Sequence, residues 1–415
     1  MTLAKLDAAL RDEVAALEAA GRAKAPERVI VDVLPAEGAF GPRYRLRGSD
    51  QAFLRMNSNS YLSLSHHPEV LAAADAASHQ FGAGPGAVRF IDGTFAAHVA
   101  LEERIAAFCD RPAAKIFNSA YTTNLGVALA IQNKQTYWIG DELNHNCIIR
   151  AMRIAGVPRS HKAIFPHNDL QALAAALDNV PEGIERVVVI FDGVFSMRGD
   201  HAPIDQIEAL LAPHRDRYPQ GLVTVCDDSH GIGAFGATGR GTEEVVGARA
   251  DILVGTFGKA FGVNGGFVAA SEAVIEAVRQ KADTYIYTNP LSVADCAAAE
   301  VAVGIADATD GRARLAHVQA RCQQLRDGIA RLGFESIDGV HPVVPLLVRD
   351  TAETRRAVQA FYDAGVLVVG LNFPVVPQGD QTIRFQINAA HTEADIAYVL
   401  DVLEGMALKP GTKPA

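Results

Sequence analysis

Apolar residues recur at helical spacing over the first twenty positions of the chain. They share one face of a helix: Leu3, Leu6, Leu10, Val14 and Leu17. The spacing predicts an amphipathic helix that ends near Gly21. Its apolar stripe requires a partner, either the body of the protein or a second subunit. A polar connection that contains proline follows the helix.

Short apolar runs and helical patterns then alternate. Several runs are continuously apolar, which is typical of parallel strands covered by helices on both faces. The expected strands are residues 114–117, 136–139, 186–191, 222–226, 251–257 and 265–270. Helical patterns lie between them, for example over 169–180 and 204–214. The alternation predicts an α/β domain with a mostly parallel sheet.

The pattern changes after about residue 300, where longer helical stretches precede two more strand-like runs. The helical stretches are 296–332 and 352–364, and the runs are 365–371 and 382–388. A capping box of Thr392 and Asp395 is expected to open the last helix. We therefore predict an N-terminal helix and arm, a large domain and a small C-terminal α+β domain, over residues 1–60, 61–300 and 301–415.

Composition and charge narrow the class of protein. The 415 residues are 49% hydrophobic and carry a net charge of −10, so nothing indicates nucleic acid or an anionic membrane as a partner. No apolar run approaches the roughly 20 residues of a transmembrane helix, and no signal-peptide pattern opens the chain. Five scattered cysteines argue against a disulfide framework and a thiolate metal site. We expect a soluble cytoplasmic protein without a bound metal.

Candidate chemistry begins with Lys259 in the glycine-rich turn GTFGKAFG. Glycines let a ligand approach the backbone, and a lysine walled by apolar groups loses its proton and attacks a carbonyl carbon. Asp227 and His230 lie in VCDDSHGIGAFG, at the end of the preceding predicted strand. A pyridine ring needs such a carboxylate on its nitrogen to act as an electron sink, and His230 would bond the phenolic oxygen of that ring. An ordinary turn and a strand-end cap are the plainer alternatives for each segment alone.

Three further segments follow predicted strands. FNSAYTTN (117–124) precedes a helix, whose first N–H groups bind phosphate, although on this segment alone a simple N-cap is the better explanation. DELNHNCII (141–149) places His145 where its imidazole could stack on a flat ring. FDGVFSMRGD (191–200) brings Asp192 and Ser196 towards the same sheet edge.

The order of these segments resembles the α-oxoamine synthase family of fold-type I pyridoxal-phosphate (PLP) enzymes, over roughly residues 45–405. The other matching segments are NSNSYLSLSHHPEV, GAGPGAVRFIDGTFAAHVALEERIA and IRFQINAAHT. Within the family, VRFIDGT, DELNHNCII, DDSHGIG and FPVVPQGDQTIRFQINAAHT are most similar to the glycine C-acetyltransferase branch. The resemblance implies a large domain with a mostly parallel, helix-covered sheet and a smaller C-terminal α+β domain.

The resemblance also implies roles for individual residues. Lys259 is expected to be the Schiff-base lysine of PLP, with Asp227 on the pyridinium nitrogen and His145 stacked on the ring. The phenolic oxygen is expected to be bound by Ser196 and His230. The phosphate and the ring edge are expected to be surrounded by Ser119, Ala120, Tyr121, Thr256 and Thr288. Arg384, aided by Asn59, is expected to hold the amino-acid carboxylate, because a guanidinium fork matches a carboxylate. His145, Asp227, His230 and Lys259 are the expected catalytic residues.

Three positions depart from the family pattern. Arg198 stands where an acidic or small polar residue is usual, and Pro290 replaces a serine or threonine that faces the phosphate of the neighbouring subunit. SYLSL (60–64) replaces NYLGL. These departures are expected to affect the choice of acyl substrate and the contact between subunits, and to leave the chemistry at the cofactor ring unchanged.

The implied reaction joins a small amino acid, glycine first, to an acyl-CoA, acetyl-CoA first, with or without loss of the carboxylate. The product is an α-amino ketone or a 2-amino-3-oxo acid, and the enzyme is expected to be a homodimer with shared active sites. Alternatives are a sibling synthase that uses a longer acyl-CoA or acyl-carrier protein, or alanine or serine. An aminotransferase or aldolase is disfavoured by the IRFQINAAHT and VRFIDGT segments, and a non-catalytic subunit by intact Lys259, Asp227 and His230.

Overall fold

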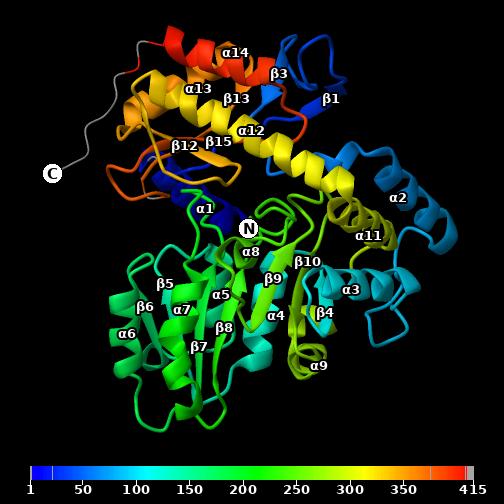
Figure 1. Ribbon diagram of the computed structural model, residues 1–415, viewed down its shortest axis with the longest axis vertical. Helices are drawn as coiled ribbons and strands as arrows, with labels where there is room; N and C mark the ends of the chain where they lie inside the picture. Colours follow the sequence, from blue (N-terminus) through cyan, green and yellow to red (C-terminus); the bar gives the residue numbers. More distant parts are fainter. Residues whose placement is uncertain (1, 21, 374, 407, 409–415) are drawn as a thin grey trace.

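A seven-stranded sheet forms the centre of the computed structural model, which describes residues 2–20, 22–373, 375–406 and 408 (Figure 1). The strands, in spatial order, are β4 (Ala113–Phe117), β10 (Gly266–Ala270), β9 (Ile252–Thr256), β8 (Leu222–Asp227), β7 (Arg186–Asp192), β5 (Thr136–Asp141) and β6 (Lys162–Phe165). Only β10 runs antiparallel to its neighbours. The mostly parallel sheet is confirmed, and β6 is a strand that the sequence pattern did not indicate.

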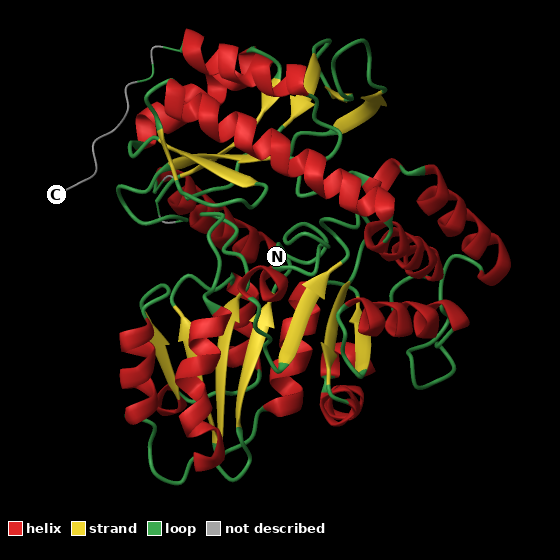
Figure 2. Cartoon of the chain, viewed as in Figure 1, coloured by secondary structure: helices red, strands yellow, loops and turns green. Residues whose placement is uncertain are grey.

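Helices cover both faces of this sheet (Figure 2). Successive residues of β7 alternate between two cores, since Val187 and Val189 pack in one and Val188 and Ile190 in the other. The first core includes residues of α2 (Pro68–Phe81), α3 (Ala96–Phe108), α6 (Leu170–Asp178), α7 (Ile204–Leu211) and α11 (Val293–Asp307). The second includes residues of α4 (Ala120–Ile131), α5 (Asn146–Ile154), α9 (Glu272–Lys281) and α10 (Asp283–Ile286), whereas α8 (Thr242–Val246) follows the loop after β8. Burial on both faces explains why the strands read as continuous apolar runs.

A second sheet lies in the C-terminal part. Its strands, in order, are β11 (Glu335–Ser336), β12 (Val343–Leu347), β15 (Thr382–Gln386) and β14 (Val369–Leu371). The helices of this part are α12 (Thr309–Arg331), α13 (Thr351–Asp363) and α14 (Glu393–Gly405). The capping box at α14 is confirmed, because Asp395 N–H donates to Thr392 Oγ1 (3.1 Å) and Thr392 N–H to Asp395 Oδ2 (2.9 Å).

The prediction of a polar connection after the N-terminal helix is wrong in part. It contains β1 (Ile30–Leu34), β2 (Arg43–Leu46) and β3 (Ala52–Arg55), which form a third sheet with β13 (Val366–Leu367). The expected run 365–371 therefore divides between two sheets. Leu54 pairs with Val366 in parallel, so the arm joins the C-terminal part across more than 300 residues of sequence. The signal was weak because β1 is short and largely exposed.

The N-terminal helix α1 (Thr2–Ala19) forms as expected, but its apolar stripe does not pack on the body of the protein. The five stripe residues, Leu3 to Leu17, are between 43% and 67% exposed. Short 3₁₀ turns complete the chain at Leu64–His66, Arg159–His161 and Ala212–Arg217. Within the described residues, no helix combines the length and apolar character needed to cross a membrane.

Candidate active site

The carboxyl ends of β5, β7, β8 and β9 meet around a small cavity, the position at which open α/β sheets bind ligands. Seven of the predicted site residues line this cavity together: Ala120, Tyr121, His145, Ser196, Asp227, His230 and Lys259. The other lining residues are Cys147, Asp192, Val194 and Ser229. The cavity is not lined by the other predicted site residues, Ser119, Thr256, Thr288, Asn59 and Arg384.

Asp227 is the last residue of β8 and is 5% exposed. Asn124 Nδ2 donates to its Oδ2 (2.6 Å), while the backbone N–H of Ser229 (3.1 Å) and the Ser229 hydroxyl donate to its Oδ1. These donors fix the orientation of the carboxylate and satisfy its charge in a buried position. Asn124 was not predicted, although it closes the FNSAYTTN segment one helical turn after Ala120.

Lys259 is half-buried in the turn between β9 and β10. Loss of hydration lowers the pKa of its amine, and the carboxylates of Asp227 and Asp192 partly oppose this effect. A lysine of this kind exchanges its proton more readily than a surface lysine and suits nucleophilic and base chemistry.

The lysine turn packs directly against the start of α4. A Cβ atom on Gly266 would lie 2.2 Å from the backbone nitrogen of Ala120, so only glycine allows this approach. Gly262 has a φ of +73°, which a glycine adopts without strain. The glycines therefore allow the turn that carries Lys259 to pack directly on the N-terminus of α4.

His145 caps α5 and lies beside Asp192. Its backbone N–H donates to Asp192 Oδ2 (2.9 Å), and its Nδ1 accepts the N–H of Cys147 (3.3 Å). Burial lowers the pKa of the imidazole, so the neutral form is favoured, with its proton on Nε2. Burial also raises the pKa of Asp192 well above its usual range, reinforced by the nearby Asp227. We did not predict Cys147 as a member of this group.

His230 is held from two sides by residues that the sequence did not indicate. Tyr61 Oη lies 2.8 Å from His230 Nδ1, and burial raises the pKa of this tyrosine above its usual value, so its hydroxyl keeps its proton and can donate it. His341 Nε2 lies 2.9 Å from the His230 carbonyl oxygen, and its Nδ1 accepts the N–H of Val343 (3.0 Å). Burial lowers the pKa of His230 well below its usual value. A neutral His230 that accepts at Nδ1 presents an Nε2–H donor to a ligand.

The expected phosphate end lies at the N-terminus of α4. Ser119 Oγ accepts the N–H of Thr122 (3.2 Å) as an N-cap, and Thr256 Oγ1 donates to the Gly265 carbonyl (2.9 Å). Thr288 Oγ1 lies 3.5 Å from Asn118 Nδ2, next to this turn. The Thr256 hydroxyl proton is used by the Gly265 carbonyl, whereas the Ser119 hydroxyl accepts here and can still donate. It and the backbone N–H groups of the first helical turn are therefore available donors for a phosphate.

Arg384 reaches the site from β15. Its Nη1 donates to the carbonyl of Ser196 (2.9 Å), its Nε is buried without a partner, and no carboxylate of the described chain lies within 4.0 Å of the guanidinium. Asn59 Oδ1 accepts from the amide of Gln386, two residues further along the same strand. A guanidinium with spare donors beside the cavity matches a ligand carboxylate.

The departure at Arg198 has a structural explanation. Its Nε donates to Asp200 Oδ2 (2.7 Å), and its Nη1 lies 3.4 Å from Asp380 Oδ2, in the segment that leads into β15. An acidic residue at position 198 would face two carboxylates here. Arg198 therefore joins the loop after β7 to the strand that carries Arg384.

Known proteins with similar sequences identify the family. The Aminotransferase class I and II family model matches residues 51–403. The 8-amino-7-oxononanoate synthase of Geobacter metallireducens is 36% identical and covers 88% of this chain and 94% of its own. The same-named enzyme of Thioalkalivibrio sulfidiphilus is 37% identical, over 84% of this chain and 86% of its own. The chain belongs to the α-oxoamine synthases.

Solved structures of the same group share the fold. A serine palmitoyltransferase from Sphingomonas wittichii is 26% identical, with a TM-score of 0.85 and 97% of both chains covered. A structure of SPT with PLP is 27% identical, with a TM-score of 0.83 over 97% of both chains. The fold-type I fold and PLP as the cofactor are thereby confirmed. The resemblance to the glycine C-acetyltransferase branch stays a prediction, because these relatives belong to two other branches.

The cavity fits the cofactor of this α-oxoamine synthase. A buried carboxylate, a lysine of lowered pKa and an imidazole line it together, with a helix N-terminus beside them. The carboxylate would meet the pyridinium nitrogen of PLP and the lysine its aldehyde carbon. The imidazole would meet the face of the ring, and the helix N-terminus the phosphate.

Proposed function

We propose that this α-oxoamine synthase joins alanine to an acyl thioester of medium length, and that the product loses the amino-acid carboxylate. The relation to 8-amino-7-oxononanoate synthases over 88% of the chain carries this proposal. The name of that product describes a nine-carbon acid with an amino group on C8 and a ketone on C7. C8 and C9 correspond to the Cα and methyl group of alanine, and C1 to C7 correspond to a seven-carbon dicarboxylic acyl group.

The residues of the chain have defined tasks in this proposal. Arg384, with Asn59, binds the carboxylate of the amino acid and orients its Cα–H bond. Lys259 removes the proton from Cα, which its lowered pKa favours because the free amine is then more abundant near neutral pH. When bound, PLP supplies a carbonyl carbon for the amine and a ring that withdraws electrons from Cα. Asp227 keeps the ring nitrogen protonated, His145 covers one face of the ring and His230 donates to its phenolic oxygen.

Glycine with acetyl-CoA is the second candidate. The segment FPVVPQGDQTIRFQINAAHT, which includes Arg384, favours it through its resemblance to the glycine C-acetyltransferase branch. Phe373 and Val375 in this segment are 64% and 48% exposed, and neither lines the cavity around Lys259.

A substrate panel distinguishes the two candidates. Alanine, glycine and serine are each combined with acetyl-, pimeloyl-, octanoyl- and palmitoyl-CoA, and kcat/KM is measured from CoA release. Each buried methylene contributes roughly 0.8 kcal/mol, or about a fourfold gain, so a medium-chain enzyme discriminates strongly against acetyl-CoA. Highest kcat/KM for glycine with acetyl-CoA would replace the first proposal with the second.

We propose further that the enzyme is a cytoplasmic homodimer. The exposed stripe of α1 has no partner within the described chain, and a second copy would cover it. All five cysteines are free and buried, which suits a reducing compartment.

A further inference from the structure

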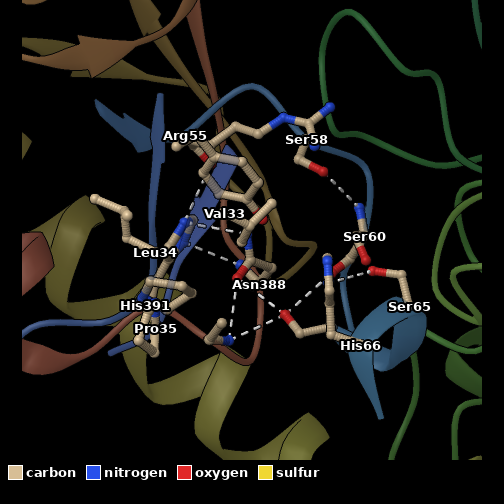
Figure 3. Close-up of a pocket in the computed structure, with 14 residues that line it drawn as sticks. Val33, Leu34, Pro35, Arg55, Ser58, Ser60, Ser65, His66, Asn388 and His391 are labelled. Atoms are coloured by element: carbon tan, nitrogen blue, oxygen red, sulfur yellow. Dashed lines mark hydrogen bonds between the residues drawn. The ribbon is translucent and has the colours of Figure 1, made fainter. Parts of the chain in front are cut away.

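A second pocket is lined in part by Ser58 and Ser60, the neighbours of Asn59 in the chain (Figure 3). Its volume is about 290 Å³, and none of its lining residues lines the cavity around Lys259. Tyr61 contacts His230 in the candidate active site, whereas the alternate residues Ser58 and Ser60 line this pocket. The two sites are therefore separated by one extended segment of chain.

The pocket contains a cation without a charged partner. The guanidinium of Arg55 lies 5.3 Å from the ring centroid of Tyr44, and within the described chain it has neither a carboxylate within 4.0 Å nor a hydrogen-bond acceptor. None of the 14 lining residues is Asp or Glu, although the chain carries a net charge of −10. The pocket is therefore positive in a protein that is negative overall.

Hydroxyl groups with spare donors lie on one side of the pocket. The Ser60 hydroxyl is buried and has no hydrogen-bond partner. The Ser58 oxygen accepts the N–H of Ser60 (3.3 Å), which leaves the Ser58 hydroxyl proton free to donate. A buried hydroxyl without a partner destabilises the fold unless a bound molecule satisfies it. The pocket is thus built for a ligand that accepts hydrogen bonds.

We propose that this pocket binds a phosphate monoester, with Arg55 as the cation and Ser58 and Ser60 as hydroxyl donors. The oxygens of a phosphate accept from a guanidinium fork and from hydroxyls at the same time. Val33, Leu34 and Pro35 form the facing side (Figure 3) and suit the organic part of the ligand. Two sources share this chemistry: a phosphate of the CoA carrier, and a separate phosphorylated molecule.

Binding is measured by isothermal titration calorimetry on holoenzyme saturated with PLP, so that the phosphate site of the cofactor is filled. The probes are inorganic phosphate and adenosine 3′,5′-bisphosphate at constant ionic strength. We expect saturable binding that weakens on the order of tenfold or more in Arg55→Gln, because a charge-assisted contact is lost. Arg45→Gln removes the same charge from an exposed position on the neighbouring strand β2 and should keep the binding.

Ser60→Ala separates a ligand role from a structural one. Its hydroxyl has no protein partner, so the variant should weaken phosphate binding while keeping the unfolding midpoint of the protein measured without phosphate. A higher KM for acyl-CoA in Arg55→Gln at unchanged kcat assigns the pocket to the CoA carrier. An unchanged KM with weakened phosphate binding assigns it to a separate ligand.

The proposal is overturned if wild-type holoenzyme shows no saturable phosphate binding, or if Arg55→Gln binds phosphate as tightly as Arg45→Gln does. These outcomes do not depend on the amino acid or acyl group that the enzyme uses. The substrate panel described above therefore tests the proposed function separately.

Discussion

Asp227 and Asp192 are buried carboxyl groups at the ends of adjacent strands, yet their surroundings differ. Asp227 has an amide, a hydroxyl and a backbone N–H as donors, which stabilise its charge. Asp192 accepts the backbone N–H of His145, and burial with the nearby Asp227 raises its pKa well above the usual range. The two carboxyl groups therefore differ in their hydrogen-bond donors, and burial favours the neutral form of Asp192.

Replacing each acid with its amide tests this difference. Asp227→Asn should lower kcat on the order of 10²-fold or more, because the charge that favours a protonated ring is lost while the shape is kept. Asp192→Asn should have a much smaller effect, because burial favours the neutral form of this carboxyl group, which an amide resembles in shape. Steady-state kcat for the best pair of substrates is the measurement, and equal losses in both variants would contradict the assignment.

Ser63 shows how one residue can be both strained and useful. It stands at the glycine position of the family segment NYLGL and has a φ of 53°, which is unfavourable for a residue with a Cβ. Its hydroxyl accepts the N–H of Ala390 (3.1 Å), next to the end of the segment that carries Arg384. The hydrogen bond offsets the backbone strain.

Two variants of Ser63 should therefore differ. Ser63→Gly loses the hydrogen bonds of this hydroxyl with Ala390 and Asn388 but also the strain, so its unfolding free energy should stay within about 1 kcal/mol of the wild type. Ser63→Ala keeps the strain and loses the bonds, so it should be destabilised by roughly 1–2 kcal/mol. Urea unfolding measures both values, and an alanine variant as stable as the glycine variant would refute the explanation.

The elements around the sheet edge are joined by charges as well as by apolar packing. His167, after β6, lies between Asp141 at the end of β5 and Asp200 in the loop after β7, with 3.2 Å from its ring nitrogens to each carboxylate. Burial alone would lower the pKa of His167, but the two carboxylates outweigh it and raise the pKa to about 9. Three strand-end loops thus share one imidazolium.

This arrangement predicts a pH dependence of stability. The folded pKa lies above the unfolded value of about 6.5, so the contribution of His167 is complete below about pH 6.5 and is lost as the pH rises through about 9. The unfolding free energy should fall by roughly 1–3 kcal/mol more in the wild type than in His167→Gln between pH 6.5 and 9.5. Urea unfolding at both pH values makes the comparison, and parallel pH profiles would exclude the effect.

The sequence predicted elements better than the contacts between them. Polar residues at the ends of predicted strands led us to expect Lys259, Asp227, His145 and His230 at one edge of the sheet. The reason is that parallel strands share their carboxyl edge. Tyr61 and His341 escaped prediction, since each reaches His230 from a distant part of the chain without a local pattern. The domain boundaries at residues 60 and 300, and the roles of the individual site residues, stay predictions.

For the whole molecule, the exposed stripe of α1 predicts association. Leu6→Glu combined with Leu10→Glu should dissociate a dimer, because two charges then replace apolar surface at the interface. Ala8→Glu on the opposite face of the helix is the matched control. Light scattering after gel filtration gives the molar mass, and a wild type that is monomeric at micromolar concentration would rule out the dimer.

The pairing of β3 with β13 has a consequence for the order of folding during synthesis. The last strand of the central sheet ends at Ala270, whereas β3 must wait for Val366 to leave the ribosome. The central sheet can therefore form while the C-terminal part is still being made, since domains fold as they emerge. Until then β3, which pairs with β2 on its other side, is an open edge that other chains could join. Arg384, on β15, is then the last of the predicted site residues to be made, after the sheet that carries Lys259 has folded.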